Sequence, residues 1–115
     1  MAAAEDKLVI VWSSSDRDVA LNMVFMYVLN ATRNGWWAEV ELIVWGPSAK
    51  LLCEDMDLQH HVQEMMKAGV AFRACIACAN NYGLADTLAA MGIDVRGMGV
   101  PLTEHLKAGT RVLTF

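Results

Sequence analysis

Glycines divide the chain into segments that alternate between two kinds of pattern. Gly69, Gly92 and Gly109 each close a helix-like pattern and open a short run rich in β-branched residues. Glycine suits these joints because the residue after a helix often takes the left-handed conformation. Gly35, after Asn34, forms a fourth joint of the same kind.

The β-branched runs predict five strands, over Leu8–Trp12, Val40–Trp45, Val70–Cys75, Asp94–Gly97 and Arg111–Phe115. Strands that alternate with helices form βαβ units, and right-handed crossovers then give a parallel sheet covered on both faces. We therefore expect an α/β fold with three layers, α/β/α, around a five-stranded parallel sheet. A chain of 115 residues has the size of one domain, so we expect a flexible N-terminus over 1–6 and a single domain over 7–115.

The chain is richer in apolar residues than its size requires. The types AVILMFWYC make up 56% of it, whereas average usage is about 45–50% even with glycine included. Part of the surplus is expected to lie against another copy or a partner, because a small domain leaves much of its surface in water. The first helix, expected over about 16–33 after a cap at Ser15, carries apolar residues around most of its circumference. We therefore expect a homo-oligomer with this helix in the interface.

Charge and targeting features exclude several function classes. Nine Lys and Arg residues against thirteen Asp and Glu residues give a net charge of −4, and the basic residues are scattered singly. This disfavours nucleic acid and anionic membrane surfaces as partners. The N-terminus lacks the pattern of a secretory signal, and no apolar run approaches the length of a membrane span. Together with an odd number of cysteines, three, this predicts a cytoplasmic protein with reduced thiols.

The reactive residues of the chain are two cysteines near the end of the third expected strand. In open α/β sheets the site lies beyond the carboxyl ends of the strands. Cys75 ends a strand there, and Cys78 follows three residues later in the next helix. Backbone N–H groups and the dipole at a helix start favour a thiolate. We therefore expect Cys75 and Cys78 to be the catalytic residues, whereas Cys53 is expected to be a buried structural cysteine.

The other strand ends supply the expected substrate pocket. Arg73 lies two residues before Cys75 and on the same side of its strand, so its charge is expected to favour the thiolate. The pocket is expected to be formed by Trp12, Ser14, Trp45, Arg73 and Met98.

A zinc site is the first alternative for the cysteine pair, since C-x-x-C is half of one. No second C-x-x-C exists, and the adjacent His60 and His61 would point about 100° apart on a helix. We expect His61 to be packed in the protein and His60 and His105 to lie on the surface. No metal and no cofactor are therefore expected.

Disulfide exchange is the second alternative, because Cys75-Ile76-Ala77-Cys78 has the thioredoxin-type spacing at a helix start. The thioredoxin pattern places its motif near the front of the chain and ends in an antiparallel hairpin. Here two more helix–strand units of the parallel type follow the motif. Dithiol chemistry in a different scaffold remains open.

Two segments resemble the DsrE/DsrF-like sulfur-relay family: VAFRACIACANNYGL, over 70–84, and the ending MGVPLTEHLKAGTRVLTF, over 98–115. The similarity runs from about Lys7 to the C-terminus. It implies a small cytoplasmic protein with a flavodoxin-like parallel architecture that assembles as a trimer, a hexamer or another oligomer. It also implies a cysteine after the third strand that carries sulfur as a persulfide. The interval to the glycine closing the next helical segment fits Cys75 to Gly83, so Cys75 takes the carrier role.

The leading functional hypothesis is therefore a sulfur carrier, similar to a sulfurtransferase. Cys75 accepts sulfane sulfur from a donor protein or small persulfide and passes it to an acceptor thiol. Cys78 either resolves the persulfide into a disulfide with release of sulfide, or lines the helix start. Two other functions stay open: a dithiol–disulfide oxidoreductase using both cysteines, and a non-catalytic oligomeric assembly module.

Overall fold

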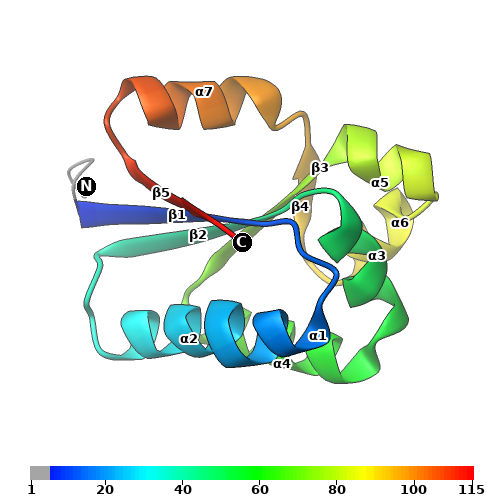
Figure 1. Ribbon diagram of the computed structural model, residues 1–115, viewed down its shortest axis with the longest axis horizontal. Coiled ribbons are helices and arrows are strands. Elements are labelled where there is room, and N and C mark those ends of the chain that lie inside the picture. Colours follow the sequence, from blue (N-terminus) through cyan, green and yellow to red (C-terminus); the bar gives the residue numbers. More distant parts are fainter. Residues whose placement is uncertain (1–5) are drawn as a thin grey trace.

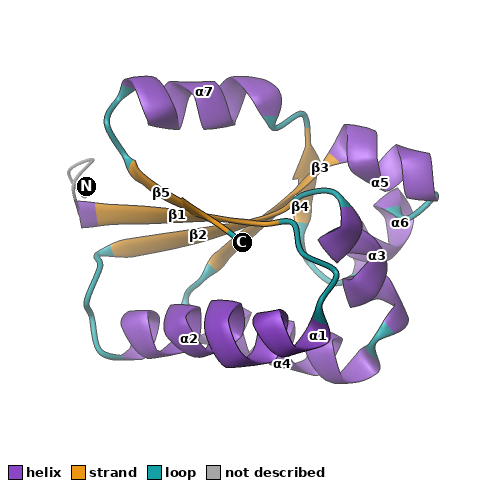
Figure 2. Ribbon diagram, in the orientation of Figure 1, coloured by secondary structure: helices purple, strands orange, loops and turns teal. Residues whose placement is uncertain are grey.

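Five strands form one parallel sheet in the order β4-β3-β2-β1-β5 in the computed structural model, which describes residues 6–115 (Figure 1, Figure 2). The strands are β1 (Lys7–Trp12), β2 (Glu39–Val44), β3 (Ala71–Cys75), β4 (Asp94–Arg96) and β5 (Arg111–Thr114). Each begins and ends within one residue of the predicted bounds, so the predicted α/β fold is confirmed. Residues 1–5, most of the N-terminus expected to be flexible, lie outside the described range.

Helical segments connect the strands. After β1 come α1 (Arg17–Val19), the π-helical η2 (Ala20–Phe25) and α2 (Met26–Arg33), which follow one another directly. After β2 come α3 (Pro47–Glu54) and α4 (Met56–Ala68), and after β3 come α5 (Ile76–Tyr82) and α6 (Ala85–Ala90). After β4 comes α7 (Gly99–Lys107).

The strand order decides which face of the sheet each helix covers. β1 to β4 step outward in one direction, so right-handed crossovers place their helices on the same face. The connection from β4 to β5 returns to the far side of β1, which puts α7 on the opposite face. Figure 1 shows α7 above the sheet and α2 and α4 below it, which gives the three expected layers.

Alternation along the strands divides the buried residues between two cores, since successive strand residues point to opposite faces. The larger core lies on the side of α2 and α4 and takes Leu8, Ile10 and Trp12 from β1. The smaller core lies under α7 and contains Val9, Val11, Ile43, Cys75 and Met98. Cys75 and Trp12 therefore belong to different layers of the protein.

The start of the first helical segment differs from the prediction in its cap. The N-cap residue of α1 is Asp16 instead of Ser15, and its carboxylate accepts hydrogen bonds from the backbone N–H groups of Asp18 (2.8 Å) and Val19 (3.2 Å). Ser14 contributes by accepting from the backbone N–H of Asp16 at 3.1 Å. An aspartate is as good a cap as a serine, and only the backbone geometry decides which residue takes the position.

The smaller core also contains a buried carboxylate. Glu41, in the middle of β2, is 3% exposed. Its Oε1 accepts from Arg73 Nε at 3.0 Å and from Lys7 Nζ at 3.5 Å, and its Oε2 lies 3.2 Å from Nε2 of His105. The expectation that His105 lies on the surface is therefore wrong: α7 places its ring, only 19% exposed, against this carboxylate.

Opposing effects act on the pKa of Glu41. Burial raises the pKa of this carboxyl, but the hydrogen bond from Arg73 and the charges of Lys7, Arg73 and His105 lower it more, so the pKa lies below its ordinary value. The ionised carboxylate therefore stabilises the fold fully above the pKa of the unfolded state. That contribution is lost as the pH falls through the lower folded pKa.

Replacement of Glu41 by Gln should lower stability at neutral pH by about 1–3 kcal/mol, because two cations then face an uncharged group. The variant should also lose less stability than the wild type when the pH falls below about 5, near the ordinary glutamate pKa. Urea unfolding across the acid range measures both effects, with Glu64→Gln, whose side chain is 40% exposed, as the control. Equal pH dependence in wild type and Glu41→Gln would contradict this role for the carboxylate.

Candidate functional site

Cys75 stands where β3 passes into α5. It is the last residue of the strand and the N-cap residue of the helix, with extended backbone angles of φ −72° and ψ 118°. Its side chain points to the face covered by α7 and is 6% exposed, in the smaller core beside Ile43 and Met98. The predicted position at a carboxyl strand end is thus confirmed, although the side chain is nearly enclosed.

Cys78 lies one turn further along α5, where residues three apart share a helix face. Its thiol is half-buried in the same cluster as Cys75, and both cysteines are free thiols. Burial raises the pKa of the Cys78 thiol, the backbone N–H of Gly46 lowers it in part, and the Cys75 thiol raises it again. The net pKa is raised, so Cys78 is protonated at neutral pH.

Gly46 can approach Cys78 because of its backbone conformation. It precedes α3 with φ 78° and ψ −139°, a region open essentially to glycine. Ser48, two residues later, is fully buried and donates a hydrogen bond to the backbone carbonyl of Trp12. Ser48 therefore anchors the turn after β2 to β1. The backbone N–H of Gly46, in the same turn, faces Cys78.

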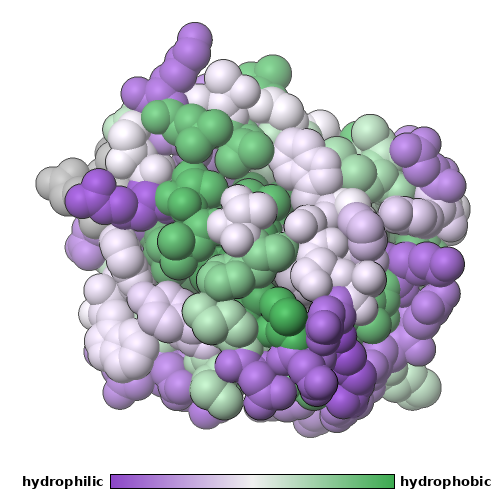
Figure 3. Space-filling view, viewed as in Figure 1, coloured by the Kyte–Doolittle hydropathy of each residue, from purple (hydrophilic) through white to green (hydrophobic). Residues whose placement is uncertain are grey.

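Trp45 and Met98, two of the predicted pocket residues, lie with both cysteines. All four belong to the cluster beneath α7. Trp45 also lines an apolar groove of about 370 Å³ between α7 and the β1–β5 edge, together with Val11, Ser13, Leu102, Leu106, Val112 and Thr114. Figure 3 shows hydrophobic side chains gathered over this part of the molecule. Trp45 is therefore shared between the groove and the cluster that holds the thiols.

The structure does not bring Trp12 to the thiols. Its ring packs edge-to-face against Phe25, with centroids 5.0 Å apart, in the larger core on the other face of the sheet. Alternation along β1 sends this residue away from the layer that contains Cys75. Its Nε1 is a buried polar atom without a partner among residues 6–115.

Ser14 and Arg73 have other roles than the predicted ones. Ser14 supports the helix start described above. Arg73 shares a face with Cys75, but its guanidinium is held by Glu41 Oε1 at 3.0 Å and by Asp94 Oδ2 at 2.5 Å. Its charge is thus committed to two carboxylates and does not lie free beside the thiol.

Sequence reasoning missed Arg96 as a neighbour of Cys75. The parallel register of β3 and β4 pairs Cys75 with Arg96, and paired residues on adjacent strands point to the same side. The side chain of Arg96 is 54% exposed, and its Nη2 lies 2.6 Å from Asp94 Oδ2. Only the strand order brings the two residues together, and the expected strand boundaries carry no such information.

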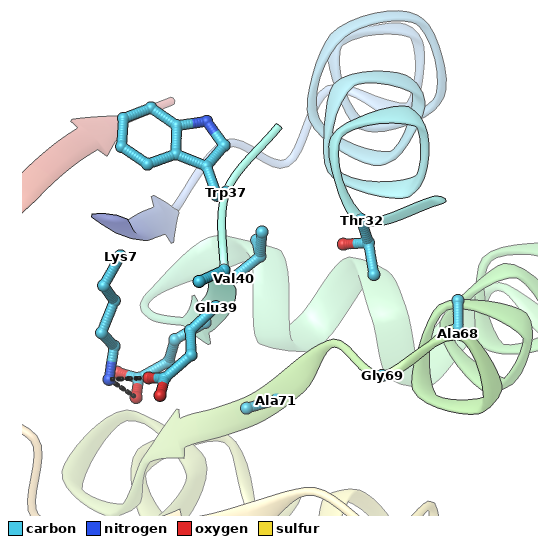
Figure 4. Close-up of a pocket in the computed structure, with 10 residues that line it drawn as sticks. Lys7, Thr32, Trp37, Glu39, Val40, Ala68, Gly69 and Ala71 are labelled. Carbon is cyan, nitrogen blue, oxygen red and sulfur yellow. Dashed lines mark hydrogen bonds and ion pairs between the residues drawn. The ribbon is translucent and has the colours of Figure 1, made fainter. Parts of the chain in front are cut away.

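The other candidate sites lie elsewhere. A cavity of about 360 Å³ opens at the amino ends of the strands, where Lys7 bridges Glu39 and Glu41 and Trp37 forms another part of the lining (Figure 4). It is at the edge opposite the thiols.

Within 6–115, no group of three or more His, Cys, Asp or Glu residues could hold a metal ion. No helix in that range has the length and apolarity to cross a membrane.

Cys53, His60 and His61 lie away from the two cysteines of the candidate site. Cys53 is partly buried at the margin of the larger core, and burial together with the charge of Glu54 raises the pKa of its thiol. His60 is exposed, as expected. His61 is not fully packed: its side chain is 43% exposed, with its ring 6.2 Å from that of Phe25. None of the three lies among the residues gathered around Cys75 and Cys78.

Comparison with known proteins identifies relatives of this arrangement. The sequence model of the DsrE/DsrF-like family matches residues 6–115. BT1422 from Bacteroides thetaiotaomicron, a conserved protein of unknown function, is 42% identical with a TM-score of 0.94, covering 96% of this chain and 95% of that one. No curated relative matches the chain.

Two more distant structures share the fold. MTH1491 from Methanobacterium thermoautotrophicum, of unknown function, is 21% identical with a TM-score of 0.80, covering 95% of this chain and 98% of that one. The ychN protein from E. coli is 16% identical with a TM-score of 0.71 and the same coverage.

In a Cys75→Ala variant, alkylation of Cys78 by iodoacetamide should reach half its maximal rate above the ordinary thiol pKa of about 8.5. Burial, the largest cause of the raised pKa, remains in that variant. Peptide mass spectrometry over a pH series measures the rate, with the same protein in urea as the control. A midpoint in the folded protein at or below that in urea would contradict the assignment.

Proposed function

We propose that this chain, which belongs to the DsrE/DsrF-like family, carries sulfane sulfur as a persulfide on Cys75 and passes it to an acceptor thiol. The observation that carries the proposal is the place of Cys75 at the carboxyl end of β3, with Cys78, Trp45 and Met98 around it. The family-level role in sulfur relay supports the same reading.

The surroundings of Cys75 suit a persulfide. Ile43, Met98 and Trp45 exclude water from most of the thiol, and a shielded site limits the side reactions of a reactive intermediate. Methionine and aromatic side chains also make favourable contacts with polarizable sulfur. Cys78, beside it in the same cluster, is only half-buried, so we propose that a donor approaches the thiol from that side.

Loading and delivery are the same exchange in opposite directions. The Cys75 thiolate attacks the outer sulfur of a donor persulfide, R–S–SH. The donor S–S bond breaks, its electron pair leaves with R–S⁻, and Cys75 becomes a persulfide without net oxidation. An acceptor thiolate then attacks the outer sulfur of Cys75–S–SH and releases the Cys75 thiolate.

Cys78 supports a second candidate, a dithiol–disulfide oxidoreductase, because it lies one helical turn from Cys75 in the same cluster. In that reaction the Cys78 thiolate attacks the inner sulfur of the Cys75 persulfide, expels hydrosulfide and forms a disulfide. The raised pKa of Cys78 keeps this thiol protonated and therefore opposes the step at neutral pH. We accordingly assign the carrier role first.

Incubation with a small persulfide donor should add one sulfur atom to the wild type, located at Cys75 by tandem mass spectrometry. Cys75→Ser should abolish loading, because the serine hydroxyl cannot replace the thiolate as nucleophile. Cys78→Ser and the matched control Cys53→Ser should retain loading. An unchanged mass at an alkylatable Cys75 would refute the carrier. A reversible Cys75–Cys78 disulfide, with turnover lost in Cys78→Ser, would establish the oxidoreductase instead.

We further propose that copies of the chain associate through the outer face of η2 and α2. Met23 (42% exposed) and Met26 (52%) lie there, and with Trp36 (56%) they line one hollow. An apolar surface of this kind is typical of an interface. The remaining residues of this segment that the sequence predicted to be in the interface, such as Val24 and Val28, instead fill the larger core.

The double variant Met23→Lys, Met26→Lys should dissociate the oligomer, because burying two unpaired ammonium groups is strongly unfavourable. Light scattering at micromolar concentration should show a multiple of the chain mass for wild type and a smaller mass for the variant. Lys50→Met, outside this face, provides a control. A monomeric wild type would refute the proposed interface, and unchanged assembly in the double variant would place it elsewhere.

A further inference from the structure

Charged side chains form a continuous series across the sheet on the face covered by α7. Lys7 joins Glu39 (3.7 Å) and Glu41 (3.5 Å), and Glu41 accepts from Arg73 at 3.0 Å. Arg73 reaches Asp94 on β4 at 2.5 Å. Asp94 Oδ2 also accepts from Arg96, which ends the series.

In the part of the chain that the structure describes, Arg96 makes fewer ion pairs than the other cations of this series and is more exposed to solvent. Lys7 and Arg73 each face two carboxylates, whereas Arg96 makes its one ion pair within 6–115 with Asp94, through Nη2 at 2.6 Å. Its side chain is also the more exposed, at 54% against 30% for Arg73. Guanidinium donors of Arg96 thus remain available to a ligand from solvent.

The position of Arg96 relates this partly exposed cation to the thiol. Arg96 is the register partner of Cys75 in the β3–β4 pair, so both side chains leave the same face of the sheet side by side. Figure 1 shows the ends of these two strands near α5. β4 is an edge strand, so a small molecule can approach Arg96 from outside the sheet.

We infer that Arg96 is a positioning residue that recruits small anionic sulfur donors, such as inorganic polysulfide, to Cys75. The inference rests on the proposed carrier function. A thiolate and a polysulfide dianion repel each other, and a cation beside the thiol offsets this repulsion where both must meet. The Cys75 thiolate attacks the terminal sulfur, one S–S bond breaks, and the shortened polysulfide leaves with the electron pair.

The electrostatic part of the inference can be tested without sulfur transfer. Iodoacetate and iodoacetamide alkylate a thiol in the same way but differ in charge, so their rate ratio at Cys75 measures attraction of anions apart from access. In a Cys78→Ser background, Arg96→Gln should lower this ratio by about threefold to tenfold at low salt, and added salt should weaken the difference. Arg96→Lys should restore much of it, and Arg111→Gln on β5 should leave it unchanged.

The same proteins are then loaded with inorganic polysulfide, followed by mass spectrometry. Slower loading of Arg96→Gln, with the alkylation ratio reduced, supports the inference. An alkylation ratio unchanged in Arg96→Gln overturns it, and so does a fall of equal size in Arg111→Gln. Absence of loading in every variant, with the ratio still reduced in Arg96→Gln, refutes the carrier function while leaving the anion-recruiting role of Arg96.

Discussion

A single buried carboxylate connects most of the parts that surround the candidate site. Glu41, on β2, holds Lys7 from β1, Arg73 from β3 and His105 from α7. Burying a carboxylate is unfavourable unless cations and donors surround it, so these elements must keep their relative positions. Met98, which packs against Cys75, directly precedes α7. The contact between Glu41 and His105 of α7 therefore also helps to hold Met98 over the thiol.

Glu41 also fixes the position of Arg73, the cation nearest to Cys75 in the sequence. Arg73 precedes the cysteine by two residues and shares its face, and sequence reasoning therefore assigned it to the thiol. The carboxylates of Glu41 and Asp94 draw its guanidinium away. We propose Arg96 for this role instead, because only the pairing of β3 with β4 brings it beside Cys75. The ion pairs with Glu41 and Asp94 thus account for the position of the Arg73 guanidinium, and the β3–β4 register accounts for the position of Arg96.

The sequence predicted local features well and relations between elements poorly. Strand boundaries and the place of Cys75 follow from short patterns, because β-branched runs and a strand-to-helix change are encoded in consecutive residues. The burial of His105 depends on where α7 packs, and the separation of Trp12 from Cys75 depends on which face each strand end presents. Both features depend on the order of the strands in the sheet and on which face each side chain points to. A short stretch of sequence does not determine either of these. Met98 and Trp45 lie in the cluster with Cys75, and both are close to strand ends in the sequence: Trp45 directly follows β2, and Met98 comes two residues after β4.

In the proposed function, the Sγ of Cys75 accepts sulfane sulfur and transfers it to an acceptor thiol, and the neighbouring Cys78 stays protonated. A chase experiment tests this most directly: protein loaded with isotopically labelled sulfane sulfur is purified and mixed with an acceptor thiol at neutral pH. The account predicts that label appears on the acceptor as a persulfide while Cys75 and Cys78 return to free thiols. Label released as sulfide, with a disulfide between Cys75 and Cys78, would contradict it.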